Sequence, residues 1–190
     1  MDAVICESTA IREWWRKERL MLPPVAPPEG ITQGVPGDVY NAYRRGRDSA
    51  CVDIMLCTRS PLGSAAVLLS KRASNVCFAN KWWMYGGALG SYEPIEEFLA
   101  GRVEKECGIR AKPEVLIGVY RTCAADFIGS TLQPCYAARI PYGKATAKAT
   151  TDSAHSSVRL FTRSELETIP IDEQHWYPMR VARLVLDNLP

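Results

Sequence analysis

The sequence predicts an α+β fold in which helices cover both faces of a mixed β-sheet. Apolar, strand-like runs occupy residues 50–72 and 114–140. Between them lies an acidic helix with an apolar stripe, and an amphipathic helix closes the chain. With 190 residues, 47% of them hydrophobic and 23% charged, the chain can bury one core of ordinary size. These observations indicate a globular protein and exclude a disordered one.

Residues 1–48 are expected to form an extension that precedes a domain of residues 49–190. The extension is predicted to contain a helix over residues 8–20, a proline- and glycine-rich connector over 22–37, and a short helix over 38–45. We interpret it as a capping subdomain or a dimer contact. An alternative is that its aromatic and basic residues line a nucleotide pocket, since rings stack on bases and arginines bind phosphates.

A β-hairpin is predicted to open the domain. The runs ACVDIMLCT, residues 50–58, and SAAVLLSKR, residues 64–72, are joined by the turn PLG. A loop then leads into Trp82 and Trp83. We interpret these tryptophans as core anchors, and a substrate-stacking role for Trp82 is the alternative.

Two further strands are expected after the acidic helix, at residues 114–124 and 132–140. Pro134 predicts a bulge or a sheet edge in the second of them, because proline cannot donate to a strand ladder. The polar stretch 141–157 is predicted to be a long loop that acts as a lid and carries His155.

The C-terminal part is predicted to contain a strand over residues 157–162, a short helix over 164–169 that Ser164 caps, and the amphipathic helix 177–189. His175 precedes the last helix, and we expect it to have a structural role.

The stretch from residue 86 to 109, GGALGSYEPIEEFLAGRVEKECGI, is where the chemistry is expected. Pro94 suits the first helical position, Glu93 is the expected cap, and Gly108 is expected to end the helix in a left-handed conformation. The buried stripe of this helix is predicted to consist of Ile95, Phe98, Leu99 and Val103.

The spacing within this stretch resembles the Nudix box, G-x5-E-x7-R-E-U-x-E-E-x-G-U, in which U is apolar. Gly87 and Glu93 match its start, and Gly108 and Ile109 match its end. The resemblance covers roughly residues 49–190. It implies a Nudix-like α/β/α sandwich and a hydrolase of a nucleoside diphosphate linked to another moiety. Three positions at which the box carries charged residues depart from its pattern: Gly101, Arg102 and Lys105.

Positions 102, 105 and 106 share one face of the expected helix. The resemblance implies that this face binds Mg²⁺ or Mn²⁺ through several carboxylates. Here it carries Arg102, Lys105 and Glu106, so its charge is about +1 instead of about −3. We expect a single ion, held by Glu106, waters and a backbone carbonyl near Gly87. The alternative is that Arg102 and Lys105 bind the substrate's phosphates directly.

One branch of the family, the GDP-mannose mannosyl hydrolases, is more similar to this arrangement, because its box keeps only the last glutamate, as Glu106 is kept here. That branch cleaves a nucleotide sugar at the sugar carbon, with an arginine from the preceding strand and a histidine from a late loop. Arg72 and His155 match these positions. The chain departs from the branch at three positions: Ala88, Gly101 and Ala154. The leading hypothesis is a metal-assisted nucleotide-sugar hydrolase in which Glu106 is the remaining metal ligand, His155 is the base, and Arg72 and Arg102 steady the diphosphate or its leaving group.

Two alternatives remain open. The first is a catalytically silent Nudix domain that binds a nucleotide as a sensor or partner module. The second is a conventional diphosphate-cleaving Nudix enzyme, which would need substitute carboxylates from Glu93, Glu97 or Glu104 at the metal. The helical face of residues 102, 105 and 106 discriminates the silent domain from the leading hypothesis. Binding alone predicts phosphate affinity without a divalent ion, whereas the enzyme predicts turnover that depends on one.

Seven cysteines without a C-x-x-C pair indicate mostly reduced thiols, and hence a cytoplasmic location. The helix dipole is expected to raise the pKa of Cys107, at the end of the acidic helix. We see no secretion signal and no membrane span in the sequence. The net charge of +2 argues against nucleic-acid and membrane partners. The expected partner is a small nucleotide substrate, and a homodimer is compatible with the sequence.

Overall fold

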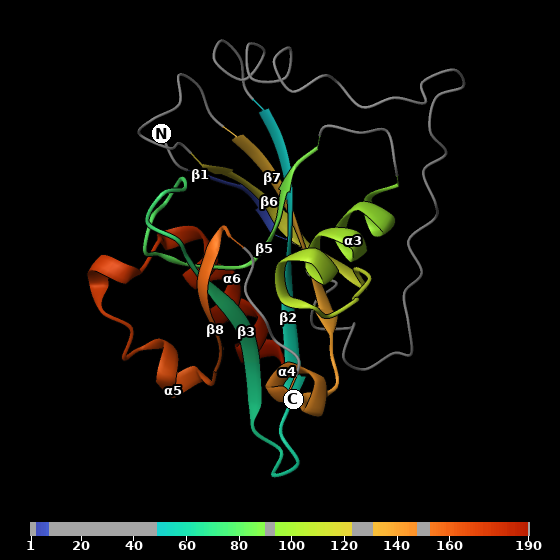
Figure 1. The fold of residues 1–190 in the computed structure, drawn as a ribbon, viewed down its shortest axis with the longest axis vertical. Coiled ribbons are helices and arrows are strands. Elements are labelled where there is room, and N and C mark those ends of the chain that lie inside the picture. The colour runs from blue at the N-terminus through green and yellow to red at the C-terminus, as the bar shows by residue number, and fades with distance from the viewer. Residues whose placement is uncertain (1–2, 8–48, 90–93, 123–130, 148–152, 190) are drawn as a thin grey trace.

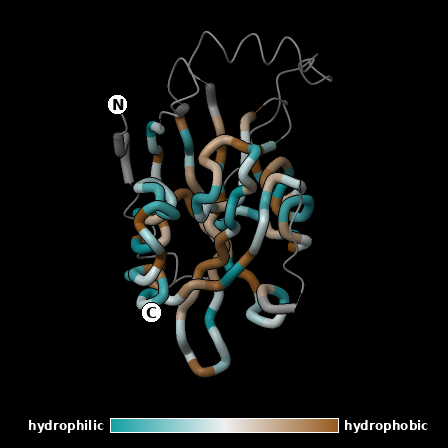
Figure 2. The backbone as a smooth tube through the Cα atoms, turned by 60° about the vertical axis from the view of Figure 1, so that its left-hand side comes forward, coloured by the Kyte–Doolittle hydropathy of each residue, from teal (hydrophilic) through white to brown (hydrophobic). Residues whose placement is uncertain are grey.

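The computed structural model describes residues 3–7, 49–89, 94–122, 131–147 and 153–189. Its architecture confirms the predicted α+β class, with a mixed β-sheet between helices (Figure 1). Figure 2 shows the apolar residues concentrated on the central strands, whereas the outer helices carry much of the polar character. Among the described residues, no helix is both long and apolar enough to cross a bilayer.

The sheet is mixed because one pair of neighbouring strands, β2 and β7, runs parallel while the other pairs run antiparallel. The main path through the sheet is β1-β6-β7-β2-β3-β4, with β5 paired to β2 and β8 paired to β3. The strands of the described part of the chain are β1 Ala3–Glu7, β2 Ser49–Arg59, β3 Ala65–Arg72, β4 Trp82–Trp83, β5 Tyr85–Ala88, β6 Val115–Thr122, β7 Thr131–Arg139 and β8 His155–Phe161.

Strands β2 and β3 separate along their length, and this split determines where the site can form. Residues 56–59 of β2 pair with residues 65–68 of β3, as the predicted hairpin requires. Residues 51–54 of β2, which precede Leu56, pair instead with β5, while β3 pairs with β4 at Ser70 and Lys71. The short segment 82–88 therefore fills the space between the two long strands.

Alternating residues of β2 contribute to two separate cores, which is why both faces of the sheet need helices. Ile54 and Leu56 lie in the core beneath helix α3, Ile95–Cys107. Met55 and Cys57 lie in the other core, which helix α6, Trp176–Asn188, covers. The two helices lie on opposite faces, as the sandwich predicted (Figure 1).

Helix α3 forms at the residues for which the sequence predicted a helix. Leu99 and Val103 are fully buried, with Ile95 and Phe98 packed beside them at partial burial. Gly108 ends the helix at φ 73°, and its N–H donates to the Glu104 carbonyl at 2.9 Å, as predicted for a left-handed cap. At the N-terminal end of the helix, the predicted first residue was one position too early.

The N-cap of α3 is Pro94, so the helix begins at Ile95 and not at the proline. Glu93, the expected cap, lies outside the described residues. Because proline has no N–H to satisfy, it suits the N-cap as well as the first helical position.

The first 48 residues contribute a strand that the sequence analysis did not predict. Strand β1, Ala3–Glu7, pairs antiparallel with β6 at one edge of the sheet. Both helices predicted for the extension, over residues 8–20 and 38–45, lie outside the described residues.

Pro134 does not mark a sheet edge, because β7 lies between β6 and β2. The parallel ladder to β2 instead passes from Leu132 to Cys135 without pairing at the proline. In the antiparallel ladder, the register shifts between Leu116 and Gly118 of β6, close to the Pro134 position. The sheet therefore tolerates the missing N–H in its interior through an interrupted ladder.

The expected long loop after β7 begins as a short helix, α4, Tyr142–Ala147, and residues 148–152 lie outside the description. The next short helix, α5, Arg163–Leu166, is capped by Thr162 and not by Ser164. Thr162 and Glu165 form a reciprocal capping box there. A 3₁₀ turn, Ile171–Glu173, then leads into α6.

Candidate active site

A cavity of about 230 Å³ opens where β2 and β3 separate. Four elements far apart in the chain deliver charged or titratable side chains to its wall, and β5 supplies backbone. These side chains are Asp53 of β2, Arg72 of β3, Arg102 and Glu106 of α3, and His155 of β8. Four of them were singled out from the sequence, and Asp53 was not.

Two consecutive glycines allow β5 to pass between β2 and α3. Gly86 has φ 144°, and a Cβ there would lie 2.2 Å from the Val52 carbonyl oxygen. A Cβ on Gly87 would lie 2.9 Å from Nη2 of Arg102. The first glycine is therefore required by the backbone, and the second leaves room for a guanidinium group.

Arg102 and Glu106 form an ion pair of 2.9 Å across one turn of α3. Glu106 also accepts a hydrogen bond from the Gly86 N–H at 3.3 Å, and Arg102 donates to the Gly86 carbonyl at 3.3 Å. The two partners differ in exposure, with 38% of the Arg102 side chain accessible against 5% for Glu106. The Arg102 side chain is thus partly exposed to solvent, whereas the Glu106 carboxylate is buried.

Asp53 lies buried at the base of the cavity, and the Tyr177 hydroxyl donates to its Oδ2 at 3.0 Å. Burial raises the pKa of Asp53 to about 7, and Glu106 adds to this, whereas the Tyr177 hydrogen bond and the two arginines oppose it. Asp53 can therefore exchange a proton near neutral pH. A charged residue within the apolar run ACVDIMLC was the sequence signal that could have identified it.

Arg72 and His155 are cross-strand partners in the β3–β8 ladder. His155 is the first residue of β8 and is buried, so it belongs to the sheet and not to the lid loop that we expected. The Ala73 N–H donates to the Ala154 carbonyl at 2.9 Å and ties the two strand ends together. The two residues that matched the GDP-mannose branch are therefore neighbours in one cavity.

The loop after β3 presents an aromatic side chain at the cavity. Phe78 has φ 57°, a left-handed conformation that is costly for a bulky residue. Arg72 supports the loop by donating from Nε to the Cys77 carbonyl at 2.5 Å. Phe78 stacks on Trp83, with ring centroids 4.5 Å apart, and both rings line the cavity.

Trp82, the tryptophan proposed for substrate stacking, lies away from the cavity wall. Its indole N–H donates to Glu173 at 3.0 Å, and its ring meets Phe161 edge to face in the core. Trp83 lines the cavity instead. The core-anchor interpretation therefore describes Trp82 best.

Lys105 is exposed and lies outside the cavity wall, although it shares the helix with Arg102 and Glu106. Glu97 and Glu104 both bind Arg110 on the exposed surface of α3, at 3.0 Å and 2.8 Å. These are two of the substitute carboxylates that a conventional Nudix enzyme would need at the metal, and neither lines the cavity.

The side chains of the cavity do not fit a divalent-ion site. The described residues contain no group of three or more His, Cys, Asp or Glu side chains placed to hold a metal ion. Glu106, the one retained box glutamate, is already bound by Arg102 and by the Gly86 N–H. A hard cation needs several free oxygen ligands, and here it would have to displace a guanidinium group.

Five cysteines of the described residues are reduced thiols that form no disulfide: Cys51, Cys57, Cys77, Cys107 and Cys135. The pKa of Cys107 is raised to about 11, as predicted in direction, with burial as its main cause and Glu106 contributing. His175 caps α6 by accepting the Tyr177 N–H at Nδ1, at 3.3 Å, which agrees with a structural role.

Solved structures with the Nudix fold are similar to this chain. The Nudix domain of Shewanella oneidensis NrtR, solved in complex with ADP ribose, has a TM-score of 0.60 at 18% identity, covering 82% of this chain and 100% of that one. The MutT protein from Methanosarcina mazei Go1 has a TM-score of 0.57 at 17% identity, covering 74% and 94%. A MutT/nudix family protein from Enterococcus faecalis has a TM-score of 0.58 at 16% identity, covering 96% and 80%.

At these identities the likeness shows the fold, so the chain has the Nudix fold that the box spacing predicted. No family profile matches the sequence, and no curated protein does.

Proposed function

We propose that the chain is a Nudix-type hydrolase that cleaves a nucleoside diphosphate sugar of the GDP-mannose kind at the sugar carbon. The observation that carries this proposal is the meeting of Arg72, Arg102 and His155 at one cavity of a Nudix fold. Two guanidinium groups match a diphosphate, and an imidazole beside them matches a water to be activated. The NrtR domain, which has the same fold, was solved in complex with ADP ribose, which also contains a diphosphate.

The cavity has the right size for the reacting part of such a ligand. Its volume of about 230 Å³ is below the range of roughly 300–1,000 Å³ found for pockets that enclose a whole ligand. In the proposal the diphosphate and the sugar occupy the cavity, and the nucleoside lies toward its mouth, where Phe78 offers an aromatic ring.

The proposed reaction begins with a water molecule that attacks the anomeric carbon of the sugar. The bond from this carbon to the diphosphate oxygen breaks, and its electron pair leaves with the nucleoside diphosphate. His155 takes the proton that the attacking water loses, so the products are a free sugar and a nucleoside diphosphate. Arg72 and Arg102 stabilise the charge that develops on the leaving diphosphate. No step of the proposal passes through a metal ion, because Arg102 already pairs with the Glu106 carboxylate.

The test is turnover of a panel of nucleoside diphosphate sugars, dinucleotides and nucleoside triphosphates, with products identified by phosphorus NMR. Release of free sugar with an intact nucleoside diphosphate supports the proposal. Release of a nucleoside monophosphate would instead indicate conventional cleavage within the diphosphate. In the His155→Gln variant we expect the rate to fall by about 10²–10⁴-fold with KM little changed, because only proton transfer is lost.

Asp53 is the competing proton acceptor, since its pKa of about 7 also suits proton transfer at neutral pH. If His155→Gln retains activity and Asp53→Asn loses it, the base assignment moves to Asp53. Thermal melting of both variants shows whether each still folds, because both side chains are buried.

A second candidate is a catalytically silent domain that binds a nucleotide as a sensor. The closed Arg102–Glu106 ion pair favours it, because that pair occupies the carboxylate that conventional chemistry would use. Binding of a ligand from the panel without turnover of any member would select this alternative.

A further inference from the structure

We propose that the Arg102 guanidinium takes the place of a divalent cation at the diphosphate, so that this cavity binds its ligand without metal. The inference rests on the proposed function, because it concerns the same ligand in the same cavity. It differs from the expectation drawn from the Nudix box, in which Glu106 holds the ion.

The difference in exposure between the two charges of the ion pair carries the inference. A metal site needs its carboxylate free to bind the ion, but Glu106 is 5% exposed and is paired with Arg102. Arg102 is 38% exposed and lines the same cavity. Of the two charged groups, the cation is therefore the more accessible to a ligand.

The backbone around Arg102 is shaped to hold the guanidinium in this place. Gly87 leaves room for it, since a Cβ there would lie 2.9 Å from Nη2 and 3.3 Å from both Cζ and Nε. Nη2 is bound to Glu106 and to the Gly86 carbonyl, while Nε is a buried atom with no hydrogen-bond partner within the described part of the chain. The group is thus fixed on one side and retains donor capacity.

Arg72, at the end of strand β3, provides a second positive charge at the same cavity. With Arg102 balanced in part by Glu106, the two arginines and one carboxylate give a net charge of about +1 when Asp53 is protonated. This balance attracts a diphosphate directly, whereas a dication brought into it would be repelled by both guanidinium groups.

The two roles of Glu106 predict opposite effects of one substitution. If Glu106 held a metal ion, Glu106→Gln would abolish ligand binding. If Arg102 binds the diphosphate, the same substitution removes a competing negative charge behind Arg102, and affinity rises. This opposition makes Glu106→Gln the decisive variant.

The experiment is isothermal titration of the full chain with ADP ribose and GDP-mannose, each in EDTA and again in MgCl₂. We expect dissociation constants in the two buffers that agree within about threefold. We expect tighter binding by Glu106→Gln, and a loss of about tenfold or more in Arg102→Gln. Arg110→Gln is the matched control, because it removes the same charge from the exposed residues just after α3 and should leave affinity unchanged.

Gly87→Ala keeps every charge and displaces only the guanidinium, so it tests the inference if Arg102→Gln fails to fold. We expect weaker binding from this variant, and unchanged affinity would overturn the inference. Binding that disappears in EDTA, returns with MgCl₂ and is lost in Glu106→Gln would also overturn it, while leaving the proposed function intact. Absence of binding and turnover with every ligand in both buffers would overturn both.

Discussion

Two arginine–glutamate ion pairs of this protein have arginines of similar exposure and carboxylates of very different burial. Arg102 and Arg183 have nearly equal exposure, at 38% and 36% of the side chain. Their carboxylate partners differ widely in exposure, because the side chain of Glu106 is 5% exposed and that of Glu167 is 53% exposed. The surroundings of the carboxylate, and not the contact itself, therefore determine what each pair contributes.

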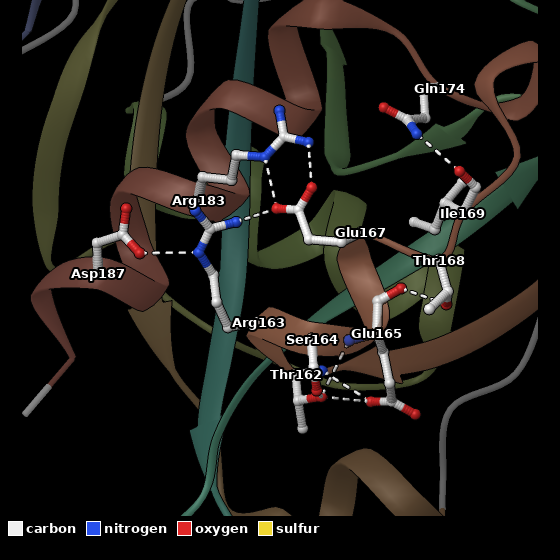
Figure 3. A network of polar contacts seen from close by, with 10 residues as sticks. All are labelled: Thr162, Arg163, Ser164, Glu165, Glu167, Thr168, Ile169, Gln174, Arg183 and Asp187. Carbon is white, nitrogen blue, oxygen red and sulfur yellow. Dashed lines mark hydrogen bonds and ion pairs between the residues drawn. The ribbon is translucent and has the colours of Figure 1, made fainter.

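The exposed pair belongs to a surface network between α5 and α6 (Figure 3). Arg183 donates from two nitrogens to Glu167, each at 3.2 Å, and Arg163 binds both Glu167 and Asp187. Water and salt compete for every member of this network, so each contact adds little stability. The Glu106 carboxylate in the cavity is buried, so water cannot replace a lost partner there, and the same kind of ion pair contributes more to stability.

The largest expected difference between the two regions comes from Asp53. Its pKa is raised from 3.8 to about 7, so between about pH 4 and pH 7 the folded protein holds a proton that the unfolded chain has released. The unfolding free energy of the native protein therefore falls as the pH rises through this window. Asp53→Asn removes the titrating group and with it this pH dependence. Between about pH 4 and pH 8, we expect the unfolding free energy of the variant to rise relative to that of the native protein by up to about 4 kcal/mol.

Urea unfolding at the two pH values measures this gain. Asp187→Asn, in the surface network, is the matched control and should change the unfolding free energy by less than about 0.5 kcal/mol at both pH values. An Asp53→Asn effect that is equal at both pH values would contradict the prediction.

The two arginines provide the next largest contrast. Arg102→Gln leaves Glu106 buried without its charged partner, and we expect it to lower the unfolding free energy by about 2–3 kcal/mol. Arg183→Gln leaves Glu167 in water, where we expect a loss of about 0.5 kcal/mol or less. Chemical unfolding at neutral pH, repeated at high salt, measures both. Equal losses in the two variants would show that burial of the carboxylate is not the deciding factor.

The smallest effect is expected at the cap of α5, within the surface region. Thr162→Ala removes the hydroxyl that accepts the Glu165 N–H and keeps the backbone N–H of residue 162 that donates to the Glu165 side chain, and we expect a loss of unfolding free energy of about 1 kcal/mol. Ser164→Ala, at the cap that the sequence suggested, should cost clearly less, because within the described part of the chain the Ser164 hydroxyl hydrogen-bonds only to the Thr162 hydroxyl. A thermal-melting comparison decides between the two caps, and a larger shift for Ser164→Ala would contradict the capping box seen here.

The local parts of the fold follow from short stretches of sequence. The stripe and glycine cap of α3, the β2–β3 hairpin and the amphipathic α6 were all predicted, because each depends on residues within a few turns or one hairpin. The Nudix box also predicted the sandwich, since its spacing is itself local. Strand β1 was missed because only its pairing with β6, more than a hundred residues later, makes it a strand.

The sequence by itself determined four members of the candidate site, namely Arg72, Arg102, Glu106 and His155. The tertiary structure decided what surrounds them. The raised pKa of Asp53 comes from burial and is opposed by the hydrogen bond from Tyr177, 124 residues away in the chain, so no local pattern could supply that shift. Trp83 replaces Trp82 at the cavity because adjacent strand residues point in different directions, and which one faces the site depends on register.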